Sequence, residues 1–241
     1  MNGEYKILLS NSSFEILKVN NLCHKFPMHI HKRACIGRID SGSKILFING
    51  KTILLNQGDL FIIPAFEPHL CYTKNGTPVS YTVICFDADI NELNANIINI
   101  LSKFIKTEKT DFFIENLCGI IKKNNKPRNQ KVDKLLTFID ENYMENLTVK
   151  LLAEITYFSP FHLLHLFKQE IRISLHQYIL QTRIKKFIEK AAFSKNNILD
   201  IGLYCGFYDQ SHLIRNFKKY VGATPQKYIN SVELISKIES F

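Results

Sequence analysis

Three histidines in the first third of the chain are spaced as groups of a single site. His29 and His31 are two residues apart, so on a β-strand both side chains would point to one face, which in a barrel is the interior. His69 follows Pro68 after a series of hairpin signals, where barrel geometry would return it to the same cavity. Imidazole nitrogens bind zinc and other borderline metals. The spacing predicts either a divalent metal site or polar groups of a ligand pocket.

A second pattern is an internal repeat in the last third of the chain. Residues 162–179, HLLHLFKQEIRISLHQYI, match residues 212–229, HLIRNFKKYVGATPQKYI, at a constant offset of 50. The identical pairs mix apolar, aromatic and basic side chains: His162/His212, Leu163/Leu213, Phe167/Phe217, Lys168/Lys218, Tyr178/Tyr228 and Ile179/Ile229. A match of this density predicts two copies of one helical unit.

Each copy has the residue types that a helix-turn-helix needs. The second helix must cross the first at a small residue, which Ala153 and Gly202 supply. Permissive turns follow at residues 157–159 and 206–209. The inner faces of the second helices would then be apolar: Leu163, Leu166 and Phe167 in the first copy, Leu213 and Phe217 in the second.

The recognition helices are expected at about 160–170 and 210–220, joined through a helix that includes residues 182–193. Each recognition helix could enter a major groove of DNA. The alternative is an ordinary helical bundle with an incidental repeat, since amphipathic helices are common. Spacing, helix caps, repeat and basic residues agree with one another, which favours the DNA-binding interpretation.

The first 89 residues have the pattern of antiparallel strands. Short runs rich in Ile, Val, Phe and Tyr alternate with turn residues such as Asn49-Gly50, which accept positive φ. The clearest runs are residues 36–39, 44–48, 52–55, 60–63 and 79–86. A small β-barrel or sandwich is predicted.

Helical periodicity begins after Asp89, with apolar faces over residues 93–104 and 112–121. Residues 123–131 are polar and basic and are expected to be a linker. The predicted fold class is therefore α+β with two domains. An antiparallel β-barrel with flanking helices occupies residues 1–122, and an all-α domain with two helix-turn-helix units occupies residues 132–241. One flanking helix is expected to mediate a two-fold homodimer.

Composition narrows the class of protein further. Thirty-one basic and twenty-two acidic residues give a net charge of +9, which favours a polyanionic partner such as nucleic acid. The six cysteines form no C-x-x-C pair and are expected to be reduced thiols. No apolar run approaches the roughly 18 residues of a membrane span, and the N-terminus lacks the pattern of a secretory signal. A cytoplasmic protein without a membrane partner is expected.

Residues 130–230 resemble the DNA-binding domain of the AraC/XylS family of bacterial transcription regulators. The segment IGLYCGFYDQSHLIRNFKKYVGATPQKY is similar to that family's signature. Residues 26–90 resemble its cupin-type regulatory domain, with the histidines in the expected order among Gly42, Gly50, Gly58-Asp59 and Pro64. Three departures from the family pattern concern packing: Arg172 stands where glycine is usual, and Phe187 and Gly202 each replace an alanine.

The resemblance implies which side chains contact DNA. In the first unit the base-reading positions correspond to Phe161, Leu164 and His165, and in the second unit to Gln210, Ser211, His212 and Arg215. Arginine can bond guanine bidentately and glutamine can bond adenine, so the second unit suits base reading better than the apolar first unit. The remaining basic positions suit phosphates, or form a solvated basic face: Lys168, Lys218 and Lys219.

Metal-binding cupins, which the N-terminal region resembles, use two histidines, a glutamate and a later histidine. Cys35 stands where that glutamate would be, so a zinc-like ion held by His29, His31, His69 and Cys35 is one expectation. An organic-ligand pocket lined by the same histidines, without metal, is the other. An iron-dependent cupin enzyme is a third class, against which the missing carboxylate and the attached DNA-reading units argue.

The expected function is that of a regulator, not an enzyme. Two helix-turn-helix units would bind double-stranded promoter DNA under the control of a small-molecule effector in the cupin cavity. A metal- or redox-sensing regulator that uses the His/Cys cluster is the alternative. RNA polymerase would be a partner if the protein is an activator.

Overall fold

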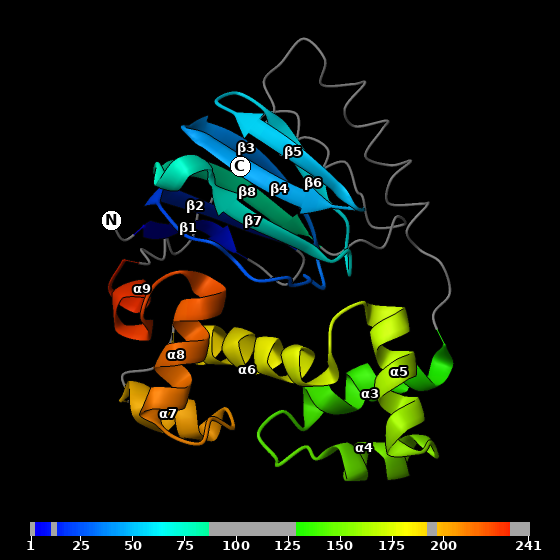
Figure 1. The fold of residues 1–241 in the computed structure, drawn as a ribbon. Coiled ribbons are helices and arrows are strands. Elements are labelled where there is room, and N and C mark those ends of the chain that lie inside the picture. The colour runs from blue at the N-terminus through cyan, green and yellow to red at the C-terminus, as the bar shows by residue number, and fades with distance from the viewer. Residues whose placement is uncertain (1–2, 11–13, 87–128, 192–196, 232–241) are drawn as a thin grey trace. The chain divides into compact units, whose positions relative to one another are not determined.

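The computed structural model describes residues 3–10, 14–86, 129–191 and 197–231. They fall into two compact units, one built mainly from residues 1–126 and the other mainly from residues 127–232 (Figure 1). The first unit is a β domain and the second is helical among the described residues, as the sequence predicts.

The β domain consists of two antiparallel sheets (Figure 1). The larger sheet has the order β1-β2-β8-β3-β6 and the smaller has the order β5-β4-β7. The strands of the larger sheet are β1 (Glu4–Ser10), β2 (Phe14–Leu22), β3 (Ala34–Ser41), β6 (Leu60–Ile63) and β8 (Val79–Phe86). Those of the smaller sheet are β4 (Ser43–Ile48), β5 (Lys51–Asn56) and β7 (His69–Thr73), which a short 3-10 turn, η1 (Lys74–Gly76), follows.

The β4–β5 hairpin shows how local chemistry sets the register of this domain. Asn49 and Gly50 both have positive φ, 52° and 71°, as the two-residue turn that matches strand twist requires. The register then pairs Ile48 with Lys51 across the turn. Along β4, buried and half-buried residues alternate, so one face of the strand packs into the core.

The structure adds three strands, β1, β2 and β7, to the five runs named from the sequence. β2 lies between β1 and β8, and β7 lies beside β4. The expected helices over residues 93–104 and 112–121 lie outside the described residues, as does the surface through which one of them was expected to dimerise.

The helical unit contains seven helices within the described residues (Figure 1). They are α3 (Gln130–Glu141), α4 (Val149–Thr156), α5 (Pro160–Ile171), α6 (Leu175–Ala191), α7 (Ile198–Tyr204), α8 (Gln210–Val221) and α9 (Pro225–Ser231). The predicted recognition helices correspond to α5 and α8. The helix predicted over residues 182–193 corresponds to α6, which begins seven residues earlier, at Leu175.

Helix α3 begins at Gln130, inside the stretch expected to be a linker. The side chain of Asn129 accepts a hydrogen bond from the backbone N–H of Lys131 at 2.9 Å and so caps the helix. The polar composition of this stretch concealed a helix start, because capping residues are themselves polar.

Candidate nucleic-acid interface and histidine cluster

The first helix-turn-helix unit consists of α4, a tight turn and α5. Tyr157 ends α4 in the left-handed conformation, with φ 56°, and its N–H bonds back to the last turn of that helix. Ser159 then caps α5: its Oγ accepts the N–H of His162 at 3.2 Å, and Pro160 takes the first helical position. Cap and proline begin the recognition helix where the sequence predicts.

The second unit repeats this arrangement with α7 and α8. Asp209 caps α8 by accepting the N–H of His212 at 2.7 Å. Gly206 forms the turn with φ 84°, and a Cβ there would lie 2.8 Å from the carbonyl oxygen of Tyr143. Gly202 lets α8 approach α7 closely, since a Cβ on Gly202 would lie 2.7 Å from Leu213 Cδ2. A larger residue at this crossing would therefore require the Leu213 side chain to shift.

The two copies share the same internal aromatic contact. The rings of Phe167 and Tyr178 meet edge-to-face at 5.7 Å, and those of Phe217 and Tyr228 at 5.6 Å, with interplanar angles of 68° and 69°. Because these four residues occupy equivalent repeat positions, the sequence repeat corresponds to a repeated packing unit. Phe187 of α6 adds a contact to Phe217 at 5.5 Å.

Nearly all of the predicted DNA-contacting side chains are exposed. Phe161 is 82% exposed and Leu164 is 43% exposed, both on α5. Seven others are also exposed: His165, Lys168, Gln210, Ser211, Arg215, Lys218 and Lys219. Phe161 and Leu164 lie three residues apart and therefore on the same side of α5, where contact with another molecule would bury both.

His212 differs from the other predicted readers because it is half-buried and held by the turn. Its Nδ1 accepts the backbone N–H of Tyr208 at 3.3 Å, and its ring meets Phe207 edge-on at 5.5 Å. Partial burial, aided by the charge of Arg215, lowers the pKa of His212 below its ordinary value. The neutral ring that results is the form able to accept the Tyr208 N–H, so this side chain supports the turn that presents α8.

Two exposed aromatic residues next to the recognition helices were not predicted as contact residues. Tyr157 is 89% exposed and Tyr208 is 87% exposed, and each lies in the turn before a recognition helix. Sequence patterns identified these positions only as turns. A tyrosine that a turn holds in solvent carries no periodic signal, so only the structure reveals its exposure.

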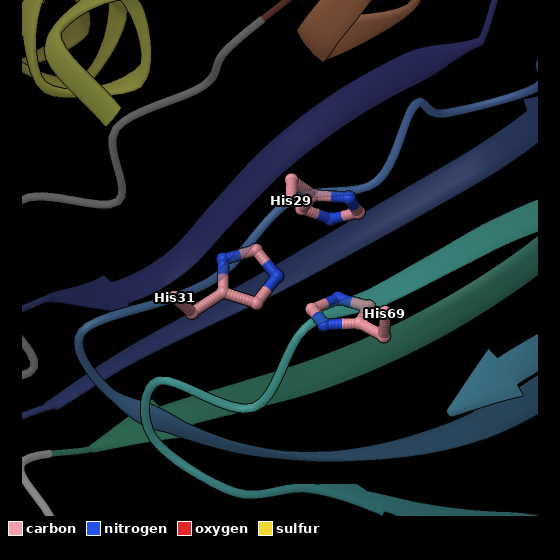
Figure 2. Close-up of side chains that lie close together, drawn as sticks. All are labelled: His29, His31 and His69. Carbon is pink, nitrogen blue, oxygen red and sulfur yellow. The ribbon is translucent and has the colours of Figure 1, made fainter. Parts of the chain in front are cut away.

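The three histidines lie close together in the structure (Figure 2). One potential ligand nitrogen from each of His29, His31 and His69 lies within 4.8 Å of the others, and the rings of His31 and His69 are 4.9 Å apart. His69 is the first residue of β7 and is fully buried. The expectation that His29 and His31 share a strand was wrong: both lie in the segment between β2 and β3, which nevertheless carries their rings toward His69.

Hydrogen bonds orient two of these rings. His69 Nδ1 lies 2.9 Å from the carbonyl oxygen of Glu67, and His29 Nδ1 lies 2.8 Å from that of Pro27. A carbonyl only accepts, so in the neutral rings Nδ1 carries the proton and Nε2 carries the lone pair. Fixing the tautomer in this way is typical of metal-ligating histidines. The cluster could hold a metal ion.

Cys35 is not part of this cluster among the described residues. Its Sγ lies 2.8 Å from Cys85 Sγ, on the neighbouring strand β8. The expected four-ligand set is therefore reduced to three imidazoles. The resemblance to metal-binding cupins put Cys35 at the position of their glutamate, but its thiol lies against Cys85 of β8.

Comparison with known proteins defines the class to which this architecture belongs. The family model for the AraC-like ligand binding domain matches residues 13–137, and the model for a helix-turn-helix domain matches residues 152–231. The chain is thus a helix-turn-helix regulator with a separate ligand-binding domain. It belongs to the AraC/XylS family of transcription regulators.

Individual relatives agree with this assignment. The uncharacterized HTH-type transcriptional regulator YbfI of Bacillus subtilis is 27% identical over 238 residues, which cover 83% of this chain and 85% of YbfI. The melibiose operon regulatory protein of Escherichia coli is 29% identical over 141 residues, covering 58% of this chain and 47% of that protein. The unsaturated fatty acid-bound structure of ToxT from Vibrio cholerae has a similar fold, with a TM-score of 0.66 at 14% identity over 95% of this chain and 99% of ToxT.

Within the described residues, no helix combines the length and the apolar character needed to cross a lipid bilayer.

Proposed function

We propose that this protein binds promoter DNA sequence-specifically through α5 and α8, and that a small-molecule effector in the β domain controls that binding. The observation that carries the proposal is the pair of matching helix-turn-helix units, each with the predicted contact face of its second helix exposed. We further propose that the protein acts in the cytoplasm and that it is a regulator rather than an enzyme. We also propose that the protein forms a homodimer. If it activates transcription, it would contact RNA polymerase.

The two recognition helices would make different contributions. On α8, Arg215 can bond guanine bidentately and Gln210 can bond adenine, while Ser211 can bond either edge. On α5, the apolar Phe161 and Leu164 suit thymine methyl groups, and His165 adds a polar contact. Specificity would therefore come mainly from α8, with α5 adding apolar contacts and register.

Phosphate contacts would come from lysines near the ends of the same helices. Lys168 lies in the last turn of α5, and Lys218 and Lys219 lie in the last turn of α8. Their ammonium groups are exposed and can displace counterions from the DNA backbone. The exposed rings of Tyr157 and Tyr208 lie in the turns before α5 and α8, and we propose that their hydroxyl groups add contacts to the DNA backbone.

Control by the effector requires unequal affinity for two states of the protein. An effector that binds one arrangement of the domains more tightly shifts the population toward it and changes how the helical domain meets DNA. One sequence relative is named for the melibiose operon, and the structural neighbour ToxT was solved with an unsaturated fatty acid bound. Melibiose and fatty acids are both small organic molecules. We propose an organic effector for this chain as well.

The proposal is tested by mapping bound sites across the genome and then measuring single-site variants on one mapped promoter. Arg215→Ala should cost about 1 to 3 kcal/mol of binding free energy and relax the preference at one base pair. Leu164→Ala is the matched control on the other recognition helix and should cost less discrimination. Equal or reversed losses on a panel of base-pair variants would contradict the assignment of specificity mainly to α8.

The convergence of three imidazoles favours a second candidate for the β domain, a zinc-like divalent metal bound by His29, His31 and His69. Protein purified without chelator should then retain about one equivalent of metal, because metal binding to such a site is coupled to the folding of the domain that supplies the ligands. His31→Ala should abolish retention, whereas His165→Ala, an exposed histidine of the helical unit, should leave it intact. Background metal content after incubation with zinc, nickel or cobalt would eliminate this candidate.

A further inference from the structure

Two cysteines of the β domain face each other across neighbouring strands. Cys35 on β3 and Cys85 on β8 are direct partners in the antiparallel register, and their Sγ atoms are 2.8 Å apart. Cys35 is 2% exposed and Cys85 is half-buried, so one thiol of the pair is the more accessible. Both are free thiols in the structure.

The backbone already satisfies the geometry of a disulfide. Directly paired residues of an antiparallel ladder have Cα atoms about 4.5 to 5.5 Å apart, within the range of about 4.4 to 6.8 Å that disulfides require. A bond would need the sulfurs to approach from 2.8 Å to about 2.0 Å, which small χ rotations supply. Oxidation would therefore leave the strand pairing intact.

We propose that Cys35 and Cys85 form an oxidation site, in which a hydroperoxide converts the two thiols into a disulfide that links β3 to β8. This property is separate from the binding of DNA and from the binding of an organic effector. In a reducing compartment, disulfides of this kind are transient and report on oxidants.

The reaction balances with one hydroperoxide and no other reactant. The Cys85 sulfur attacks the terminal peroxide oxygen, the O–O bond breaks, and a sulfenic acid and one water or alcohol form. The Cys35 sulfur then attacks the Cys85 sulfur, the S–O bond breaks, and the hydroxide leaves with the Cys35 proton as water. Each sulfur loses one electron, and the peroxide gains two.

Burial assigns the order of these steps. The hydrogen bond with Cys85, together with burial, raises the pKa of the Cys35 thiol well above its ordinary value. A protonated, enclosed thiol is a poor first nucleophile, because the thiolate is the reactive form. Cys85 therefore meets the peroxide, and Cys35 resolves the sulfenic acid.

Two of the other described cysteines have different surroundings and serve as controls. Cys71 is buried on β7, and burial raises the pKa of its thiol, a rise that the nearby positive charge of Lys44 partly offsets. Cys205 is fully buried at the end of α7, in the helical unit. The 2.8 Å sulfur contact is between Cys35 and Cys85, so we expect neither Cys71 nor Cys205 to become linked.

The test treats the reduced full-length protein with hydrogen peroxide and maps its peptides by mass spectrometry. We expect the Cys35 and Cys85 peptides to be joined, with a loss of two hydrogens that a thiol reductant reverses. Cys71→Ala should leave the link unchanged. Cys35→Ala should stop the reaction at a sulfenic acid on Cys85, which a dione reagent traps. Cys85→Ala should leave Cys35 as a thiol.

A folding control accompanies the variants, since alanine at a buried position can loosen the sheet. The experiment on the wild-type protein requires no substitution, so detection of its linked peptide decides by itself whether the disulfide forms. Absence of that peptide at excess peroxide, or a link through any other cysteine, overturns the proposal. A trapped sulfenic acid on Cys35 instead of Cys85 would overturn the assigned order.

Discussion

At the scale of single residues, α5 and α8 both end at a residue in the left-handed backbone conformation, but the two residue types differ. Arg172 ends α5 with φ 62°, and Gly222 ends α8 with φ 87°. In both cases the residue's N–H bonds to the carbonyl oxygen four residues earlier, Lys168 or Lys218. A residue with a Cβ pays a steric cost in this region that glycine avoids. The first helix-turn-helix unit therefore carries a backbone strain that its copy lacks.

Exchanging the two residue types should show this strain directly. Gly222→Arg should lower the free energy of unfolding of the helical unit by about 1 to 2 kcal/mol, because it puts a side chain into the left-handed region. Arg172→Gly should raise it by up to about 1 kcal/mol, the relief of strain exceeding the added entropy of the unfolded chain. Urea unfolding followed by far-UV circular dichroism measures both. A higher free energy of unfolding for Gly222→Arg together with a lower one for Arg172→Gly would mean that side-chain contacts outweigh backbone strain.

At the same scale, Cys35 and His212 show what residue types alone conceal. Cys35 has the chemistry of a metal ligand and the expected spacing from His31, yet its thiol contacts Cys85. The fifty residues that separate the two cysteines carry no local signal, since pairing across a sheet depends on register. His212 lies where the family places a base reader, but the structure shows that its imidazole also braces the turn.

At the scale of elements, α6 joins the two helix-turn-helix units and contributes to the core of the second. Phe187 of α6 is fully buried and meets the ring of Phe217 edge-to-face. Arg183 of the same helix donates to the carbonyl oxygens of Tyr143 and Glu145, at 2.9 and 2.8 Å. These contacts tie α6 to α8 on one side and to the segment after α3 on the other.

Removing the Phe187 ring should therefore destabilise the helical unit strongly. Phe187→Ala is expected to lower the free energy of unfolding by about 3 to 5 kcal/mol, from lost burial and the cavity left behind. Lys185→Ala, a half-exposed position on the same helix, should change it by less than about 0.5 kcal/mol. Thermal unfolding of the full chain distinguishes the two. A small loss for Phe187→Ala would show that the family's usual alanine fits this core without rearrangement.

Local chemistry explains why some elements were predictable. Ser159-Pro160 begins α5 within its own sequence, and Asn49-Gly50 turns the β4–β5 hairpin without help from distant residues. Strands β1 and β2 were harder, since Lys6 and Lys18 pair across them and interrupt the apolar pattern. Their place in the sheet depends on long-range pairing with β8, which a single sequence does not encode locally.

At the scale of the whole molecule, the family assignment separates two roles. Residues 13–137 match a ligand-binding domain, and residues 152–231 match a helix-turn-helix domain. The excess of basic residues across the chain favours association with a polyanion at any sequence. Sequence preference must come from the few side chains that reach base edges. We therefore expect substitutions of the proposed phosphate-contacting residues to change affinity, and substitutions of the proposed base-contacting residues to change specificity.

The most direct measurement of the central claim is the affinity of the full chain for a mapped promoter fragment and for a scrambled fragment of equal length, across a salt series. We predict that log K falls linearly with log salt, with a slope of about −4 to −8 per subunit, as phosphate contacts release counterions. The promoter fragment should bind at least about 10³-fold more tightly than the scrambled one at physiological salt. An affinity that does not change with salt, or equal affinity for the two fragments, would contradict the account.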